Sequence, residues 1–553
     1  MANRSQTWHY LILTAANDDQ AAAYEAQIHM RRETGQLNQV RDALVIADPE
    51  GRRVGSGGST LECLLEVLRR EARAGRRVAD FADAERVLRG LRILIVHAGG
   101  DSRRLPAYSP CGKIFVPLPG DSGAVLAPTL FDRLVPGFLD LPAGVPGAGQ
   151  IVVASGDALT LFDRAELGAM RAGLTALASL VRPEEAARHG VLCPNGDGSV
   201  RIYLQKPDVQ RQAEAGAIGA DGRSALDIGV MSLDAAAAVK MLGSFCAASA
   251  DGAPAIRWTE AGWNMVINHG IDLYREICCA LGTDATFADY LGGVRSSGSK
   301  LDEPVLARLF DELHAIPFHV QMLSRCSFLH FGSTRQLTES GLELVRHDTG
   351  AEPAGTILDI CTATYEGGVI DGTDAWIEGC CLRAPLSLAG RNVLVGVDVV
   401  EPFELPFGAC LDLSPGTDRA GGAAWFVRYY GVDDTFKHAV DAGAMFCGQP
   451  LARWLRAAGV EETDVWSADT PAAERTLWNA RVFPAEREHA GYRRWSWMLY
   501  IDRATVDQKR AFLAADRYSS AEIAVSVDQA AFHARRTEIR LDARRQRALM
   551  GIG

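Results

Sequence analysis

Residues 91–119 constrain the fold of this chain more tightly than any other stretch. They open with an apolar run, 91–96, whose composition is that of a buried parallel strand. The glycine pair Gly99–Gly100 follows the run. Because glycine has no Cβ, the backbone N–H groups of such a turn can approach a phosphate group closely. We therefore expect a strand that ends in a loop suited to an anionic ligand.

Two cationic side chains follow the glycine pair. Arg104 and Lys113 lie in a segment that Pro106 and Pro110 keep from forming a regular helix. A second apolar run, Ile114 to Leu118, is interpreted as another short strand. These features predict a loop that holds a triphosphate, with Arg104 and Lys113 beside its phosphates.

This order of features resembles the signature of sugar-1-phosphate nucleotidyltransferases, which is a strand, Ala-Gly-Gly, an Arg-Leu pair and a later Lys. Here Ala98–Gly100 and Arg104–Leu105 match, and Lys113 matches the later Lys. The sequence departs from the pattern at Asp101–Arg103, where Ser-Gly-Thr is more usual, and at Gly112, where Pro is frequent. The longer string HAGGDSRRLPAYSPCGKIFVPLP resembles the pyrophosphorylase region of the L-fucokinase/GDP-fucose pyrophosphorylase family.

Four further strings extend this resemblance over nearly the whole chain, in the order expected. They are GSGGST at 55–60, SGD at 155–157, QKP at 205–207 and LWNARVFP at 477–484. A dinucleotide-binding fingerprint has Gly at its sixth position, where GSGGST has Thr60. A glycine-rich loop that begins a helix is therefore the alternative interpretation. Gln205 stands where the family step has Glu, which removes one carboxylate from the expected sugar contacts.

The resemblance implies roles for individual residues. Arg104 and Lys113 would bind the triphosphate, Lys206 the sugar phosphate, and Asp227 the sugar. Residues expected to contact the nucleotide are Gly55, Gly57, Gly58, Gly99, Gly100 and Ser102. Asp157 would bind Mg²⁺ or Mn²⁺, an ion that needs only one or two carboxylates. Asp272 would be a second carboxylate for the metal, or would instead cap a helix expected over 271–291.

Composition excludes several classes of protein. The 553 residues carry a net charge of −12, with 48% hydrophobic and 23% charged residues. A nucleic-acid-binding surface is not expected, because it needs clustered excess Lys and Arg. No apolar stretch approaches the ~20 residues of a membrane span. The twelve cysteines contain no CxxC pair, so reduced thiols and a cytoplasmic location are expected.

Length and patterning predict two domains. Residues 1–345 are expected to form an α/β domain, which by resemblance is a Rossmann-like, GT-A-like nucleotidyltransferase fold. Residues 346–553 are expected to be β-rich, with helices at the C-terminus. Short aliphatic steps recur every five to seven residues over 356–400, which predicts a β-helix or, alternatively, a sandwich of short strands. The basic segment 535–547 is interpreted as a solvated helix face.

The resemblance implies the reaction of GTP with β-L-fucose-1-phosphate to give GDP-L-fucose and pyrophosphate. A sugar kinase is one alternative, but Ser519–Ala521 lacks the glycine-rich lead-in of the kinase loop and no Walker A motif is found. We therefore expect no phosphorylation of free fucose. A non-catalytic protein that binds sugar nucleotides is another alternative. The choice of base and sugar, and a homo-oligomeric state, stay open.

Overall fold

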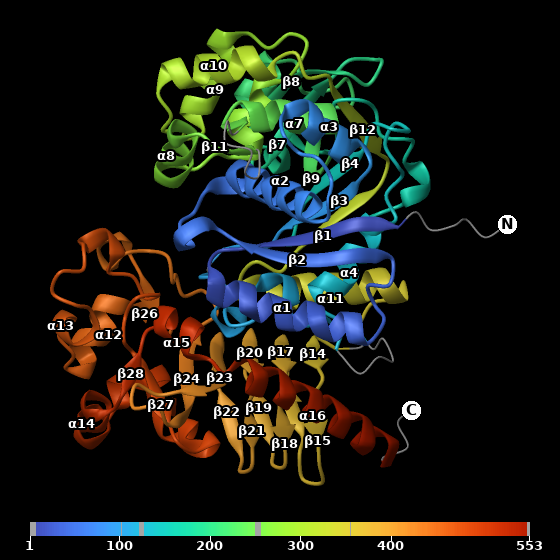
Figure 1. Cartoon of the computed structure of the whole chain (residues 1–553). Helices are drawn as coiled ribbons and strands as arrows, with labels where there is room; N and C mark the ends of the chain where they lie inside the picture. Colours follow the sequence, from blue (N-terminus) through green and yellow to red (C-terminus); the bar gives the residue numbers. More distant parts are fainter. Residues whose placement is uncertain (1–6, 101, 121–126, 249–255, 354, 550–553) are drawn as a thin grey trace. The chain divides into compact units, whose positions relative to one another are not determined.

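The computed structural model describes residues 7–100, 102–120, 127–248, 256–353 and 355–549 (Figure 1). The described chain is a mixed α/β protein with several separate sheets. None of its described helices combines the length and the apolar character that crossing a membrane requires.

Contacts divide the chain into two compact units, each of which is assembled from separate segments. Unit 1 comprises Met1–Gly100, Leu134–Gly156 and Thr160–Phe328, and unit 2 comprises Asp101–Arg133, Asp157–Leu159 and Leu329–Gly553. The signature stretch is thus shared, because its strand lies in unit 1 and its basic loop in unit 2. A division into domains at residues 345 and 346 stays a prediction.

Unit 1 is built on a mixed sheet in which the predicted signature strand is central. Its strands are β1 (Trp8–Ala15), β2 (Val40–Ala47), β3 (Arg92–His97), β4 (Gln150–Ser155), β6 (Leu174–Val181), β7 (Gly190–Pro194), β8 (Val200–Gln205), β9 (Ser224–Leu233) and β12 (Phe318–Leu323). The main order is β12-β6-β9-β4-β3-β1-β2, with β7 and β8 beside β9. Strands β1 to β4 are mutually parallel, and β9 is antiparallel to β4 and β6. The strands β1, β3 and β4 are almost fully buried, as the continuous apolar runs predicted.

Helices complete unit 1. They are α1 (Asp18–Glu33), α2 (Gly55–Arg73), α3 (Phe81–Arg89), α5 (Pro183–Ala186), α6 (Val209–Glu214), α7 (Ala235–Gly243), α8 (Glu260–His269), α9 (Phe287–Ser296) and α10 (Glu303–Leu313), and a small antiparallel pair is formed by β10 (Cys246–Ala248) and β11 (Ile256–Trp258). Leu61, Leu64, Leu65 and Leu68 of α2 are all buried in the core, which confirms its predicted apolar face. Helix α1 packs on β1 and β2.

The expected helix over 271–291 is wrong as a continuous element. A π-helical turn, Leu273–Ile277, is followed by a 3₁₀ turn, Cys278–Ala280, and α9 begins only at Phe287. Gly282 has a φ of 121°, and the backbone N–H of Thr283 donates to the carbonyl of Val200. The chain leaves the helix because its next backbone groups bond to the strand segment instead.

Unit 2 contains three parallel ladders. Their strands are β14 (Ile357–Ile360), β15 (Ala363–Thr364), β16 (Ile370–Gly372), β17 (Ala375–Glu378), β18 (Cys381–Leu382), β19 (Leu386–Leu388), β20 (Asn392–Val395), β21 (Asp398–Val399), β22 (Phe403–Leu405) and β23 (Ala409–Thr417). One ladder is β14-β17-β20-β23, the second β15-β18-β21, and the third β16-β19-β22. Paired residues lie 16 to 18 positions apart in the first step of the three ladders and 17 apart in the later steps, so the ladders repeat with a period of about 17 residues.

Antiparallel strands and helices complete unit 2. They are α11 (Thr334–Thr349), β24 (Ala423–Gly431), β25 (Met445–Phe446), β26 (Gln449–Pro450), α12 (Leu451–Ala458), α13 (Glu462–Val465), β27 (Phe483–Glu486), α14 (Val506–Ala514), β28 (Arg517–Tyr518), α15 (Ser520–Ser526) and α16 (Gln529–Leu549). Helix α11 packs on β14 and β17, and α16 packs on β15 and β23. Helix α4 (Leu130–Leu139) and strands β5 (Ala158–Phe162) and β13 (Cys326–His330) include points where the chain passes between the units.

The expected second strand, Ile114 to Leu118, is wrong. Lys113–Phe115 forms a 3₁₀ turn, and only an isolated bridge from Pro117 to Thr129 follows it. The apolar side chains are buried as expected, but Pro117 and Pro119 lack the N–H groups that a strand in a ladder donates.

Candidate functional site

Helix α1 holds the glycine turn of unit 1 in place. Gly100 has a φ of 119°, which favours glycine. Its carbonyl oxygen accepts a hydrogen bond from Gln20 Nε2 at 3.1 Å, and the carbonyl of Ala98 accepts one from the hydroxyl of Tyr24 at 2.8 Å. The turn after β3 is therefore tied from both of its ends, which fixes the backbone of Gly99 and Gly100.

A half-buried chain of polar groups leads from β3 to the start of α2. His97 Nε2 lies 3.0 Å from Thr60 Oγ1, and that hydroxyl donates to the carbonyl of Ser56 at 2.8 Å. Thr60 therefore accepts from an Nε2–H of His97. Burial lowers the pKa of His97 to about 4, despite the nearby charge of Asp272. His97 is thus a neutral hydrogen-bond donor near neutral pH.

The glycines of the GSGGST string have a packing function within unit 1. The N–H groups of Gly57 and Gly58 donate to the carbonyl of Ile271 at 2.8 and 3.2 Å. A Cβ on Gly55 would lie 2.3 Å from that same oxygen, and one on Gly58 would lie 3.0 Å from a methyl of Val266. The close approach of this backbone explains the glycines, and contact of all three with a nucleotide stays a prediction.

Asp272 is a helix cap. Its Oδ1 accepts from the N–H groups of Tyr274 and Arg275 at 3.0 and 2.8 Å, and its Oδ2 accepts from the hydroxyl of Ser56 at 3.3 Å. Oδ1 is therefore committed to the backbone, whereas Oδ2 accepts a longer hydrogen bond from a side chain. A metal-binding function for Asp272 stays a prediction.

Lys206 borders a pocket of unit 1 with a volume of about 880 Å³. Its side chain is exposed, and its backbone has a φ of 51°, which is uncommon for a residue other than glycine. The N–H of Lys206 donates to the carbonyl of His189 at 2.9 Å, which holds the step from β8 to Pro207. The pocket lies between this step and α9; it is lined among others by Tyr203, Gln205, Lys206, Arg211, Asp289 and Tyr290.

Asp227 is buried beneath this pocket wall. Its Oδ2 accepts from the hydroxyl of Tyr203 at 2.8 Å, and its Oδ1 from the N–H of Gly229 at 2.8 Å. Burial raises the pKa of Asp227 to about 6. A Cβ on Gly190 would overlap the Tyr203 hydroxyl at 1.9 Å, so glycine is needed there for this contact. Asp227 therefore positions Tyr203, and its direct contact with a sugar stays a prediction.

The basic loop of the signature begins unit 2. Ser102 has a φ of 53° and is buried, and the described residues offer its hydroxyl no hydrogen-bond partner. The guanidinium of Arg103 lies 5.9 Å from the ring centre of Trp478, which belongs to the LWNARVFP string. Two strings that the sequence analysis identified separately are thus in contact within one unit.

Arg104 and Lys113 approach a common point beside Gly332. A Cβ atom on Gly332 would lie 3.7 Å from Arg104 Nη2 and 3.8 Å from Lys113 Nζ. The N–H and hydroxyl of Thr334 both donate to the carbonyl of Arg104, at 2.9 and 3.3 Å. Unit 2 therefore brings together the two predicted cations. Sequence reasoning missed Gly332, because a single Gly before a helix gives no signal of its own.

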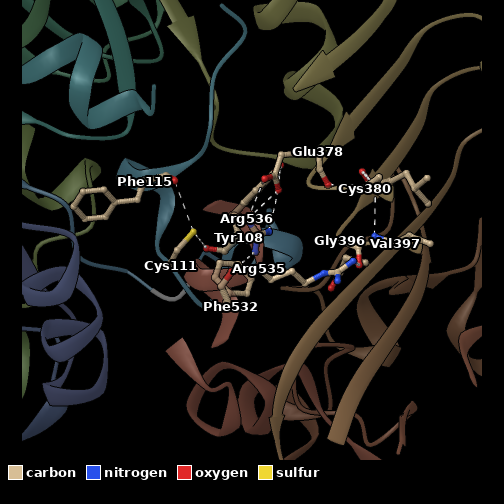
Figure 2. A network of polar contacts seen from close by, with 12 residues as sticks. Tyr108, Cys111, Phe115, Glu378, Cys380, Gly396, Val397, Phe532, Arg535 and Arg536 are labelled. Atoms are coloured by element: carbon tan, nitrogen blue, oxygen red, sulfur yellow. Dashed lines mark hydrogen bonds and ion pairs between the residues drawn. The ribbon is translucent and has the colours of Figure 1, made fainter. Parts of the chain in front are cut away.

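A buried ion pair contacts the signature loop through Tyr108 (Figure 2). Arg536 of α16 contacts Glu378 of β17 through Nε at 3.0 Å and Nη2 at 2.9 Å. The hydroxyl of Tyr108, in the loop, donates to Glu378 at 3.4 Å and accepts from Trp376 Nε1 at 2.8 Å. The interpretation of 535–547 as a solvated face is therefore wrong at Arg536, whose side chain is only 15% exposed, whereas that of Arg545 is 73% exposed.

Two further contacts hold the same loop. Gln529 at the start of α16 donates to the carbonyl of Pro110 at 2.8 Å. Arg428, which forms a fully buried ion pair with Asp412 at 2.7 Å, reaches Ser109 Oγ at 3.5 Å. The position of the basic loop thus depends on strands and a helix that follow it by several hundred residues.

Asp157 lies in the turn after β4, where the sequence predicted it, and is exposed. Among the described residues, no group of three or more His, Cys, Asp and Glu side chains is arranged to hold a metal ion. Metal binding by Asp157 therefore stays a prediction.

Comparison with known proteins identifies the family. Residues 85–488 match the fucose pyrophosphorylase domain, a span that includes the signature loop, both strings after β4 and β8, and the three ladders. The chain belongs to the fucose pyrophosphorylase family.

Three relatives show how far this similarity extends. A bifunctional fucokinase/GDP-fucose pyrophosphorylase of Arabidopsis thaliana is 26% identical over 95% of this chain and 51% of the relative. An L-fucokinase/L-fucose-1-P guanylyltransferase of Bacteroides fragilis is 25% identical over 90% and 48%. A human fucose-1-phosphate guanylyltransferase is 25% identical over 87% and 82%. The chain spans about half the length of the first two of these relatives.

A solved structure from Thermus thermophilus, named mannose-1-phosphate geranyltransferase, aligns with 77% of this chain and 96% of its own. It is 10% identical, with a TM-score of 0.29, which is too low to establish a shared fold.

Proposed function

We propose that this chain is a nucleotidyltransferase that joins GTP and β-L-fucose-1-phosphate into GDP-L-fucose and releases pyrophosphate. The observation that carries the proposal is the approach of Arg104 Nη2 and Lys113 Nζ to one point of unit 2, within a chain of the fucose pyrophosphorylase family. The names of its human and Bacteroides relatives support the choice of substrates.

In the proposed reaction, an oxygen of the sugar phosphate attacks the α-phosphorus of GTP. A new P–O bond forms, and the bond from the α-phosphorus to the oxygen that bridges to the β-phosphate breaks. Pyrophosphate leaves with that electron pair. Negative charge grows on the leaving group, where Arg104 and Lys113 would neutralise it. The chemistry needs positioning rather than a covalent protein intermediate.

The sugar phosphate is proposed to bind at the pocket beside Lys206. The exposed ammonium group of Lys206 suits a phosphate, and the pocket of about 880 Å³ is large enough for a hexose phosphate. Buried Asp227 would fix the Tyr203 hydroxyl, so that the wall of the pocket keeps its shape. Gly99, Gly100 and Ser102 would line the nucleotide side through their backbone groups.

A divalent metal ion, Mg²⁺ or Mn²⁺, is part of the proposal. The exposed carboxylate of Asp157 has the hard oxygen atoms that these ions prefer, and Oδ2 of Asp272 is the remaining candidate ligand. When bound, such an ion would neutralise charge on the phosphates. Asp157 and Asp272 would hold the ion, and the hydroxyl of Ser56 would orient the carboxylate of Asp272.

We also propose finer descriptions of the fold. The parallel strands β1 to β4 of unit 1 support a Rossmann-like, GT-A-like nucleotidyltransferase fold. The similar period of the three ladders in unit 2 supports a short β-helix. Twelve free cysteines support a reducing, cytoplasmic location.

The test is a pyrophosphate-release assay with four nucleoside triphosphates, each paired with several sugar-1-phosphates. We expect release with GTP and fucose-1-phosphate to exceed the other pairs, and to stop when EDTA is added. Absence of release with every pair would refute the proposal. Binding of GTP without release would favour the non-catalytic alternative, and fucose-1-phosphate formed from ATP and fucose would favour the kinase.

A further inference from the structure

Gly332 is a buried glycine that neither its backbone nor its packing explains. Its φ lies outside the left-handed region, so an L residue could adopt its conformation. The atoms nearest to an added Cβ are the ends of three polar side chains, at 3.7–3.8 Å, which is ordinary van der Waals contact. By contrast, a Cβ on Gly341 in the same unit would lie 2.5 Å from a methyl of Leu358.

The missing side chain leaves room in front of two cations. Arg104 Nη2 and Lys113 Nζ both face this point, and Gln336 Oε1 lies at the same distance as Arg104 Nη2, 3.7 Å. A phosphate oxygen that bonds to a guanidinium or ammonium nitrogen lies about 2.7–2.9 Å from it, which is closer than the Cβ would be. A phosphate that contacted both nitrogens from the side of Gly332 would therefore compete with a methyl group at 332 for the same space.

We propose that Gly332 is a residue of the triphosphate-binding site, kept without a side chain so that a phosphate can contact Arg104 and Lys113 together. The inference rests on the proposed function, since it assigns a further residue to the same phosphates. From its sequence, the signature loop is expected to hold the triphosphate. To that triphosphate-binding site we add Gly332, in the segment before α11.

The position of Gly332 relative to these cations is fixed by hydrogen bonds. Thr334, two residues further, donates from its N–H and its hydroxyl to the carbonyl of Arg104. Ser333 directs its hydroxyl to Gln336 Oε1 at 2.9 Å and does not cap the first N–H groups of α11. The positive end of the helix therefore adds to the field of the two side chains.

The test compares Gly332→Ala with Gly355→Ala, a matched control at which an added Cβ meets no atom within 4 Å. Binding of GTP and of pyrophosphate would be measured by calorimetry, together with the KM of each substrate and the midpoint of thermal unfolding. We expect Gly332→Ala to bind both ligands about tenfold more weakly or worse, as one extra carbon in a tight site can do. Its unfolding midpoint and its KM for fucose-1-phosphate should equal those of Gly355→Ala.

Each outcome separates this inference from the proposed function. Wild-type affinity for GTP and pyrophosphate in folded Gly332→Ala would overturn the inference, even if the wild-type protein releases pyrophosphate. If the wild type binds GTP but releases no pyrophosphate with any acceptor, the proposed function fails and the comparison of affinities still decides the role of Gly332. A wild type that binds neither ligand would overturn both.

Discussion

Replacing Arg536 by Ala should destabilise unit 2 strongly. The side chain of Glu378 is 2% exposed, and its carboxylate receives both Nε and Nη2 of Arg536. Removing the guanidinium leaves a buried carboxylate whose bond from the Tyr108 hydroxyl, at 3.4 Å, is a weak substitute (Figure 2). Breaking a buried pair in this way costs about 3–5 kcal/mol. Urea unfolding followed by tryptophan fluorescence would measure the loss in free energy of unfolding.

Two further variants test whether the ion pair is the cause. Arg545→Ala removes an arginine of the same helix whose side chain is 73% exposed, and should change the free energy by no more than about 0.5 kcal/mol. In the double variant Arg536→Met/Glu378→Gln, the buried charge is gone, so the loss should be smaller than in Arg536→Ala. A loss below about 1 kcal/mol in Arg536→Ala, or strictly additive effects in a cycle of single and double variants, would refute the reasoning.

Three other predictions concern the proposed site. Arg104→Ala should lower kcat by about 10²–10³-fold with an unchanged unfolding midpoint, because the exposed side chain acts on charge that grows in the transition state; near-normal kcat in a steady-state assay would argue against it. Asp157→Asn should raise the Mg²⁺ concentration needed for half-maximal rate in a metal titration, and an unaltered titration curve would remove Asp157 from the metal site. Burial raises the pKa of Asp227 to about 6, so the protonated carboxyl stabilises the folded state. This contribution to the free energy of unfolding is fully present below about pH 4 and is lost as the pH rises through 6. Asp227→Asn should therefore gain about 3 kcal/mol relative to wild type between pH 4 and 7 in urea unfolding, and a difference that is constant with pH would exclude this linkage.

Local patterns predicted the elements that carry their own signals. The apolar run before Gly99 is β3. The short aliphatic steps of 356–400 correspond to strands that pair in parallel. In each case, the residues that determine the structure are neighbours in the sequence, so their spacing is enough.

Features that depend on distant partners were not predicted. The glycines of 55–58 resemble a phosphate loop, but the carbonyl that occupies two of their N–H groups belongs to Ile271. Arg536 resembles a surface arginine until Glu378, 158 positions away, is placed beside it. Gly332 belongs to no sequence motif, because its proposed role depends only on the space that its missing side chain leaves beside Arg104 and Lys113.

The long-range support of the signature loop has a consequence for synthesis of the protein. The carbonyl of Pro110 accepts a hydrogen bond from Gln529, which is 419 positions later in the chain. At 5–20 residues per second, a ribosome needs roughly 20–80 seconds to make the intervening chain. During that time, the loop that carries Arg104 and Lys113 lacks the helix that holds it. Nascent chains that stop before α16 would therefore expose an unsupported basic loop, and this loop would reach its final position only after α16 has been made.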